Sequence, residues 1–355
     1  MLNRECGVYQ TTYQGDMALY PVPLARYASI AALVVLALIP ALLDSHSMAL
    51  VNLITLAAIG AIGLNILVGY TGQVSLGQGA FMMVGSYAAA IATARYGVPF
   101  WLGLPLGGAV AAVVGAFFGI PSLRIKGLYL AIATLAAQFI IEWGINHSTW
   151  ISGGAQSTIY IPTPTFLGWE INTEFRRYYM ILPVAVIAYV AALNLVRSRV
   201  GRAFIAVRDR DVAAEIIGVS VFKYKLLAFA VSSFYAGAAG ALWTYYLKIA
   251  NYEHFTLVTS VQYLAMIIIG GLGSVLGSVF GAVFITLLPI VLVYVVEGAA
   301  GVFGFEYAAI ANFLANLRLI IFGALIILFL AIEPEGLYRM WSNVRRYFRL
   351  WPYSY

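Results

Sequence analysis

The side chains of this sequence that could do chemistry gather in short segments between long apolar runs. Residues 69–81 carry hydroxyl and amide groups among glycines, and residues 197–225 carry arginines, lysines and carboxylates. The histidines His46, His147 and His254 stand apart, and their spacing supports no Ser-His-Asp or paired-carboxylate arrangement. The one cysteine can form neither an internal disulfide nor a Cys/His metal cluster. We therefore expect no catalytic site, no metal and no other cofactor.

The apolar runs that position these segments indicate a lipid environment. Hydrophobic residues make up 63% of the 355 residues and charged residues only 10%, whereas a soluble domain carries about 25% charged residues. A helix needs about 20 mostly apolar residues to cross a bilayer. Candidate runs are 25–43, 48–68, 75–95, 100–120, 127–144, 178–196, 226–247, 259–296 and 317–332. The sequence therefore predicts an all-α, polytopic transmembrane helix bundle.

The positions of the basic residues predict its orientation. Lys and Arg concentrate in the 197–225 loop, in the tail 333–355 and at Arg124 and Lys126, so we expect these segments in the cytoplasm. The basic residues are thus explained by membrane topology. Because the sequence contains no soluble domain that could bind nucleic acid, we expect no nucleic-acid partner. The segment 145–177 then falls outside, as does 297–316, which contains acids but no Lys or Arg.

This orientation requires the run 259–296 to cross twice, with its turn at residues 270–274. About ten crossings result, and both termini are cytoplasmic. The first member of that pair is short, so a broken or re-entrant segment is the alternative to a full crossing. The expected organisation is a cytoplasmic tail over residues 1–24, a transmembrane domain over 25–332 and a basic cytoplasmic tail over 333–355.

Two glycine-rich interruptions, residues 69–81 and 270–281, are candidates for a transport pathway. Non-helical backbone at membrane depth survives only inside protein or beside a watery cavity, and paired interruptions of this kind point to the pathway of a transporter. Helix packing is the alternative, because Gly273, Gly277 and Gly281 follow small-xxx-small spacing. It stays open for the second segment, while polar side chains favour the pathway for the first. The predicted pathway residues are Asn65, Thr71, Gln73, Ser75, Gln78, Gly270, Gly271 and Gly273.

The source of energy lies outside this chain. Ionisable residues within the apolar runs are scarce, and Glu142 is the main candidate, which an interfacial position explains. Buried acids or His relays would indicate an ion-coupled carrier, so their scarcity disfavours that class. The sequence also lacks a G-x-x-x-x-G-K-[ST] phosphate loop.

The loop segment 201–218 has the apolar periodicity of a short helix, and Gly218 is a plausible stop. Such a helix lies either on the membrane surface or in the groove of a partner. Because Asp209, Asp211 and Glu215 alternate with arginines, the mixed charge favours a protein partner.

Several blocks resemble the permease family of branched-chain amino-acid ABC importers, the LivM-type subunit. They are 63–81 (GLNILVGYTGQVSLGQGAF), 127–135 (GLYLAIATL), 200–204 (VGRAF) with its continuation to Gly218, 266–274 (MIIIGGLGS) and 334–336 (PEG). They occur in family order over roughly residues 45–338. The resemblance implies a type II ABC importer-like permease of the inner membrane. It also implies a homologous permease as heterodimer partner, two cytoplasmic ATPases and a periplasmic binding protein.

The resemblance further implies that 201–218 is the coupling helix that docks on an ATPase. Its expected coupling residues are Arg202, Arg208, Asp209, Asp211, Ala213, Ala214, Glu215 and Gly218. The chain departs from the family pattern at two places, one in the coupling segment and one in the first glycine-rich segment. The order Ala-Ala-Glu replaces the Glu-Ala-Ala of importer loops, and Gln78 stands where family members often carry His, which removes a titratable ring. The expected cargo is a branched-chain or other hydrophobic amino acid. Alternatives are urea, short amides or aromatic carboxylates for a permease of the same family, or an ion-coupled carrier from another class.

Overall fold

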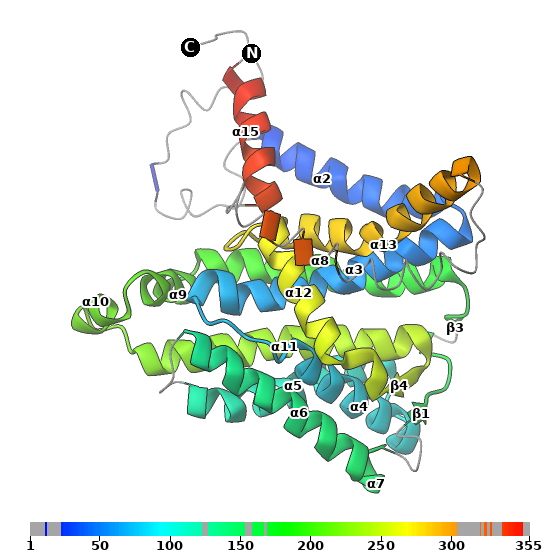
Figure 1. Ribbon diagram of the computed structural model, residues 1–355, viewed down its shortest axis with the longest axis horizontal. Helices are drawn as coiled ribbons and strands as arrows, with labels where there is room; N and C mark the ends of the chain where they lie inside the picture. The colour runs from blue at the N-terminus through cyan, green and yellow to red at the C-terminus, as the bar shows by residue number, and fades with distance from the viewer. Residues whose placement is uncertain are drawn as a thin grey trace.

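The structure, a computed structural model, describes residues 11–12, 23–122, 127–152, 158–166, 169–303, 320, 323–324, 327–328 and 336–350. Helices dominate this part of the chain (Figure 1). In chain order they are α2 (Pro23–Leu38), the 3-10 turn η1 (Ile39–Ala41), α3 (Ser45–Asn65), the π-helical turn η2 (Ile66–Tyr70), α4 (Gln78–Tyr96), α5 (Phe100–Ser122), α6 (Leu128–His147), α7 (Thr149–Ser152), α8 (Glu174–Arg197), α9 (Arg199–Asp209), α10 (Asp211–Ile216), α11 (Val221–Leu247), the 3-10 turn η3 (Tyr252–Phe255), α12 (Leu257–Gly270), α13 (Val275–Phe303) and α15 (Gly336–Leu350). The strands are β1 (Thr158–Tyr160), β2 (Thr165–Phe166), β3 (Trp169–Glu170) and β4 (Ile249–Asn251).

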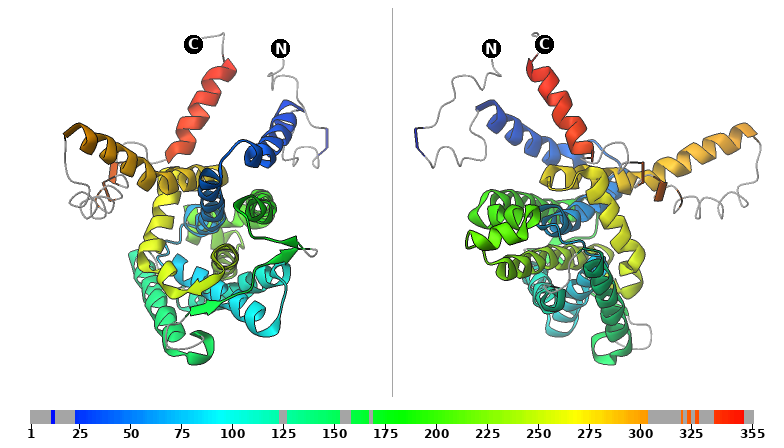
Figure 2. Two further views of the ribbon diagram at one scale, coloured as in Figure 1. Left: turned by 90° about the vertical axis from the view of Figure 1, so that its right-hand side faces the viewer. Right: turned by 60° about the vertical axis from the view of Figure 1, so that its left-hand side comes forward.

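Helix α11 lies at the centre of the bundle, and α3, α4 and α5 pack around it (Figure 2). Small residues make this close packing possible. A Cβ atom at Gly85 of α4 would collide with the backbone of Gly237 in α11, and one at Gly240 would collide with the carbonyl of Met82. Without a hydrophobic driving force in lipid, such close backbone contact is what holds transmembrane helices together.

The described helices support a multi-pass membrane protein but do not confirm the predicted number of crossings. Six are long and apolar enough to span: Ser45–Tyr70, Phe100–Pro121, Tyr129–His147, Glu174–Arg197, Val221–Leu247 and Tyr252–Gly270, with shorter apolar helices at Tyr27–Ala41 and Val275–Val291. Helix α4 occupies the predicted 75–95 run, but polar residues such as Gln78 and Arg95 lower its mean hydropathy below that of these six. Most of the predicted span 317–332, the pair Arg124 and Lys126 and most of the N-terminal tail lie outside the described residues.

The two ends of the bundle differ in character (Figure 1). At one, which we call the strand end, β1 pairs antiparallel with β4, with Ile159 opposite Ala250. This pairing joins the 145–177 segment to the α11–α12 connection, two segments that charge counting placed on the same side. Helices α9 and α10 lie at the other, which we call the α9–α10 end. Which end faces the cytoplasm stays a prediction.

The prediction of a single helix over 201–218 is wrong in one respect, because the chain forms two helices there. Ser198 caps the first, α9, by accepting hydrogen bonds from the N–H groups of Val200 and Gly201 at 3.1 and 3.3 Å. Arg210 then adopts an extended backbone (φ −156°) and separates α9 from α10. Apolar periodicity cannot detect such a break, since the spacing of apolar residues does not report whether the backbone stays helical between them. Gly218, at φ 90°, follows the end of α10 as expected.

Candidate functional site

Both glycine-rich segments interrupt helices, as the sequence predicted. After α3 the chain passes through the π-helical turn η2 and a non-helical stretch before α4 begins at Gln78. The second interruption separates α12 from α13 at residues 271–274. Gly72, Gly271 and Gly273 have φ angles of 69°, 122° and 77°. Side chains with a Cβ atom rarely adopt these values, so the turns require glycine.

Asn65, at the end of α3, joins the two segments. Its Nδ2 atom donates to the carbonyls of Gly271 (3.2 Å) and Ser274 (2.8 Å) and to the hydroxyl of Ser278 (2.7 Å). Its Oδ1 atom accepts the N–H of Gly273 at 2.9 Å. The side chain is 1% exposed. Its hydrogen bonds therefore satisfy backbone N–H and C=O groups that lipid could not satisfy. This one amide holds two interruptions together that lie about 200 residues apart.

Backbone packing accounts for much of the glycine in the second segment. A Cβ atom at Gly270 would collide with the carbonyl of Gly277, and one at Gly281 with the carbonyl of Met266. Gly69 of the first segment likewise leaves room for the Gly273 N–H group. The packing alternative therefore explains Gly270, and the pathway role of these glycines stays a prediction.

The polar residues predicted for the first segment are all buried and partnered. Gln73 Nε2 donates to the hydroxyl of Thr71 (3.0 Å), and Gln78 Nε2 donates to the carbonyl of Gly60 (3.0 Å). The Ser75 hydroxyl accepts the N–H of Gly77 at 3.3 Å. The exception is Gln73 Oε1, a buried acceptor without a hydrogen-bond partner among the described residues. The Gln73 side-chain oxygen is therefore the acceptor in this set that could take a hydrogen bond from a water or solute.

Sequence reasoning missed three residues that stabilise the start of α4. The hydroxyl of Ser260 accepts the N–H of Gly79 (2.8 Å), and Gln138 Oε1 accepts the N–H of Ala80 (2.6 Å). The hydroxyl of Thr134 accepts the N–H of Leu76 at 2.9 Å. The bonds to Gly79 and Ala80 satisfy first-turn donors that a helix cannot satisfy itself. A glutamine at position 138 inside an apolar run was the signal available in the sequence.

Helix α9 is fixed to the first glycine segment. Its buried Ala203, Phe204 and Val207 face the bundle, and Arg208 Nη1 donates to the carbonyl of Gly69 at 2.9 Å. The Arg208 side chain also lies against Gly72 and near Gly273. The predicted coupling loop and the predicted pathway segments therefore meet at one point, which neither prediction anticipated.

A pocket of about 240 Å³ marks this meeting point. Thr71 and Gln73 line it from the glycine segment, and Arg208, Asp209 and Asp211 line it from the loop. Lys225 also lines the pocket, and its Nζ atom lies 3.7 Å from the Asp211 carboxylate. Hydroxyl, amide and charged groups of both signs therefore surround it, which suits water or a small polar group.

Helix α10 extends beyond the bundle (Figure 1), and its large apolar side chains are exposed. Val212, Ile216 and Ile217 are 64%, 81% and 76% exposed. Ala213, Glu215 and Gly218 are also exposed, while Ala214 is buried. Arg202 is exposed on α9, where its Nη1 atom donates to the carbonyl of Arg197 (3.1 Å). Ala214 is thus the buried member of the predicted coupling set, whereas Arg208 is 39% exposed and still reaches the Gly69 carbonyl.

A polar cluster at the strand end was also missed. Glu174 Oε2 accepts hydrogen bonds from Asn52 Nδ2 and from the Tyr246 hydroxyl, both at 3.0 Å. Arg177 pairs with the Glu174 carboxylate and stacks over the Tyr246 ring. Asn52 is fully buried in α3, so the cluster connects α3, α8 and α11. Glu142, the acid singled out from the sequence, is only partly buried in α6.

Replacing Glu174 with alanine is expected to lower the free energy of unfolding by about 2–4 kcal/mol. The change leaves Asn52, Arg177 and Tyr246 without their shared acceptor. Thermal unfolding of the purified protein in detergent measures the loss. Glu170→Ala, at an exposed carboxylate nearby, is the control and should stay within about 0.5 kcal/mol of wild type. Equal stabilities of the two variants would show that the cluster contributes nothing.

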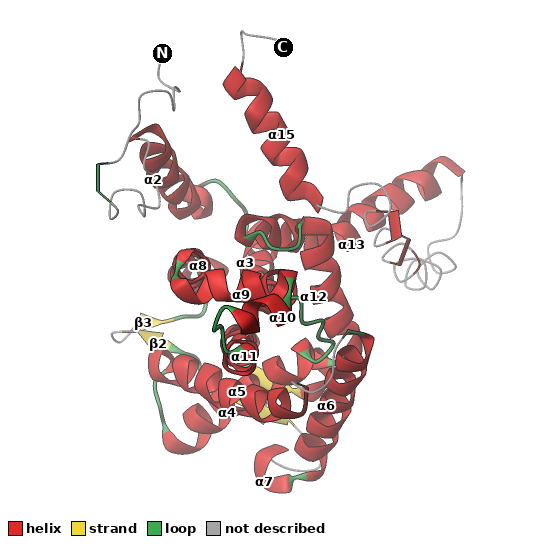
Figure 3. Ribbon diagram, turned by 90° about the vertical axis from the view of Figure 1, so that its left-hand side faces the viewer, coloured by secondary structure: helices red, strands yellow, loops and turns green. Residues whose placement is uncertain are grey.

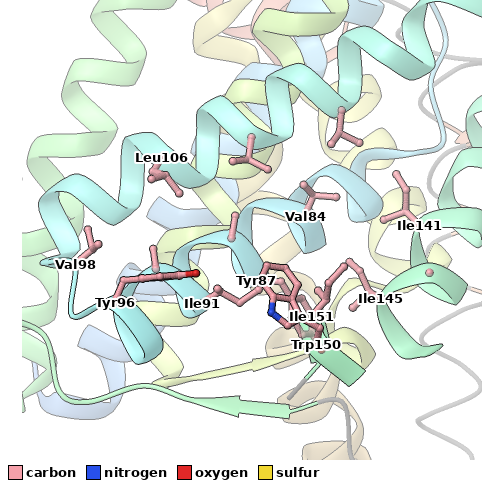
Figure 4. Close-up of a pocket in the computed structure, with 15 residues that line it drawn as sticks. Val84, Tyr87, Ile91, Tyr96, Val98, Leu106, Ile141, Ile145, Trp150 and Ile151 are labelled. Carbon is pink, nitrogen blue, oxygen red and sulfur yellow. The ribbon is translucent and has the colours of Figure 1, made fainter. Parts of the chain in front are cut away.

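A separate apolar cavity of about 840 Å³ lies between α4, α5, α6 and α7 (Figure 4). Tyr87 and Ile91 line it from α4, Leu106 from α5, Ile141 from α6 and Trp150 from α7. Its lining is almost wholly apolar, and none of the predicted pathway residues reaches it. It can hold hydrocarbon but cannot recognise a charged solute by hydrogen bonding.

The bundle of membrane-spanning helices with paired glycine interruptions defines a permease, and comparison with known proteins identifies its family. A family described as "Branched-chain amino acid transport system / permease component" matches residues 47–330. The chain belongs to this family. It is 33% identical over 267 residues to the high-affinity branched-chain amino acid transport system permease protein LivM of Escherichia coli, covering 68% of this chain and 63% of that protein.

Other relatives show how far the family extends. The LivM protein of Salmonella typhimurium is 32% identical over 258 residues, covering 66% of this chain and 61% of that protein. The autoinducer 2 import system permease protein LsrC of Enterobacter sp. is 26% identical over 286 residues, covering 76% and 79%. The chain thus spans less than two thirds of these two LivM proteins, and no solved structure is significantly similar to it.

Proposed function

We propose that this chain is a permease subunit of an ABC importer and moves branched-chain or other hydrophobic amino acids with energy from ATP hydrolysed by partner subunits. The observation that carries the proposal is the contact of Arg208 with Gly69. Through this hydrogen bond, the loop that is proposed to bind the ATPase contacts the glycine-rich segment that is proposed to line the pathway. The complex would also contain a homologous permease, two cytoplasmic ATPases and a periplasmic binding protein.

The α9–α10 pair is the proposed entry point for this energy. An ATPase that binds the exposed apolar side chains of α10 would move α9 with it, because Arg210 is the single residue between the two helices. Arg208 would carry the movement to Gly69, and Asn65 would carry it to the α12–α13 turn. The proposed route requires the α9–α10 end to face the cytoplasm, which is the side that the basic residues of the loop predict.

The cargo is proposed from the family, since family resemblance fixes architecture better than substrate. Urea, short amides and aromatic carboxylates remain alternatives for the same architecture. Uptake of radiolabelled leucine by the complete complex in proteoliposomes, with urea as competitor, tests the proposal. ATP-dependent leucine uptake supports it. Urea uptake without leucine uptake would overturn the cargo, and uptake without ATP would overturn the class.

Replacing Ile217 with serine is expected to weaken ATPase binding by roughly tenfold, because a contact residue at the centre of an interface contributes more than about 1 kcal/mol. Pull-down of the ATPase subunits across a concentration series measures the affinity. Val258→Ser is the matched control, since Val258 is an exposed apolar residue of α12 outside the proposed docking surface. The coupling surface would be misplaced if both variants bound ATPase like wild type.

A further inference from the structure

Helix α15 is amphipathic, and the proposed transport function gives it no role that explains this pattern. Leu337, Met340, Trp341 and Val344 follow the i, i+3, i+4, i+7 spacing of one face. Arg345 falls outside this face, as do Arg339 and Arg346, and the helix contains no Asp or Glu. A face of Trp and aliphatic residues beside a face of arginines is typical of helices that lie in the membrane interface.

The first turns of α15 are anchored to the α12–α13 turn. Gly336 is buried so closely against Gly271 and Ile269 that a Cβ atom there would collide with their backbone. The Trp341 ring packs edge-on against Phe280 of α13 at 6.0 Å between centroids. Around and beyond this anchor, Met340, Val344 and Tyr347 are 48%, 47% and 68% exposed. The protein therefore covers only the beginning of the apolar face.

The direction of α15 also fits an interfacial helix. In Figures 1 and 3 it stands across the common direction of α3, α8 and α11, the helices long enough to cross the bilayer. A helix perpendicular to crossing helices lies parallel to the membrane plane. Its apolar face can then enter the acyl region while the arginines remain at the level of the headgroups.

A pocket beside this helix has the chemistry of a headgroup site. It measures about 370 Å³ and is lined by Arg197 at the end of α8, Arg345 and Ser342 of α15, Tyr70, and the α12–α13 turn at Gly273 and Ser274. Guanidinium groups bind phosphate oxygens through paired hydrogen bonds. In contrast to the cavity of Figure 4, this pocket combines polar and apolar surface, as a phospholipid headgroup with adjoining chains requires.

We propose that α15 lies in the lipid interface at the α9–α10 end and that the Arg197–Arg345 pocket binds the headgroup of an anionic phospholipid. The charge of the helix selects an anionic lipid over a zwitterionic one, since each basic residue near the surface adds attraction to acidic lipids. The same pocket contacts the turn that Asn65 holds, so the bound lipid adjoins the proposed coupling route. The proposal concerns lipid binding and does not depend on the cargo or on ATP-driven transport.

Lipid retention by the full-length protein in mild detergent tests the headgroup site. Phosphatidylglycerol and phosphatidylcholine with identical acyl chains are added, and bound lipids are counted by native mass spectrometry. Wild type is expected to retain phosphatidylglycerol preferentially. Arg345→Gln should lower that retention about fivefold. Arg95→Gln, at an exposed arginine of the strand end, is the control and should lower it little. Equal retention of both lipids, or equal losses in both variants, would overturn the site.

The placement of α15 is tested separately with a polarity-sensitive dye on single cysteines in a Cys6→Ser background. Dye on Val344→Cys should shift to the blue in vesicles of phosphatidylglycerol and phosphatidylcholine. Dye on Asn343→Cys, outside the apolar face, should report a wetter environment. The same emission from both positions would show that α15 does not lie in the interface.

Discussion

Asn65→Asp is expected to destabilise the protein by about 3–5 kcal/mol, although the two side chains have nearly the same shape. The amide donates to two backbone carbonyls and to the Ser278 hydroxyl. A carboxylate has no hydrogen to donate, so it would face the carbonyls of Gly271 and Ser274 with its own oxygens. The variant would then carry a buried charge at the junction of the two glycine segments, where Asn65 makes four hydrogen bonds.

The measurement is thermal unfolding and the yield of monodisperse protein in detergent. Asn343→Asp on the exposed part of α15 is the control for the change of amide to carboxylate, and it should remain within about 0.5 kcal/mol of wild type. If Asn65→Asp unfolded at the same temperature as this control, the junction would not depend on Asn65.

Arg208→Ala is expected to separate ATP hydrolysis from transport. The change removes a charge-assisted hydrogen bond to the Gly69 carbonyl, and such bonds contribute about 1.5–3 kcal/mol. The outward face of α10 keeps its side chains, so ATPase binding should persist. We expect substrate uptake per ATP hydrolysed to fall roughly tenfold or more, since about 1.4 kcal/mol corresponds to a factor of ten.

Uptake and ATPase activity are measured on the same proteoliposomes. Arg199→Ala provides the matched control, because Arg199 lies exposed in the first turn of the same helix and carries the same charge. The control should keep the wild-type ratio of uptake to hydrolysis. Equal ratios for all three proteins would remove Arg208 from the coupling route, whereas loss of ATPase binding would assign it to docking instead.

The sequence by itself determined the environment, the class of fold and the positions of the interruptions. Apolar runs of spanning length can be stable only in lipid, so helices were predictable from composition and length. The glycines of both segments were visible because positive φ angles and close backbone contact demand them, as at Gly271 and Gly69. The family was also recognisable, because its motifs are local strings of residues in a fixed order.

Only the tertiary structure decided which of these segments meet. Asn65 was predicted to line a pathway, yet its side chain joins α3 to a turn about 200 residues later, and no local pattern encodes that distance. The same holds for Arg208 against Gly69 and for Glu174 against Asn52. The break at Arg210 was hidden because periodicity reports which face is apolar and not whether the backbone is continuous. Contacts between distant helices depend on how the helices pack, and packing is decided by the whole chain at once.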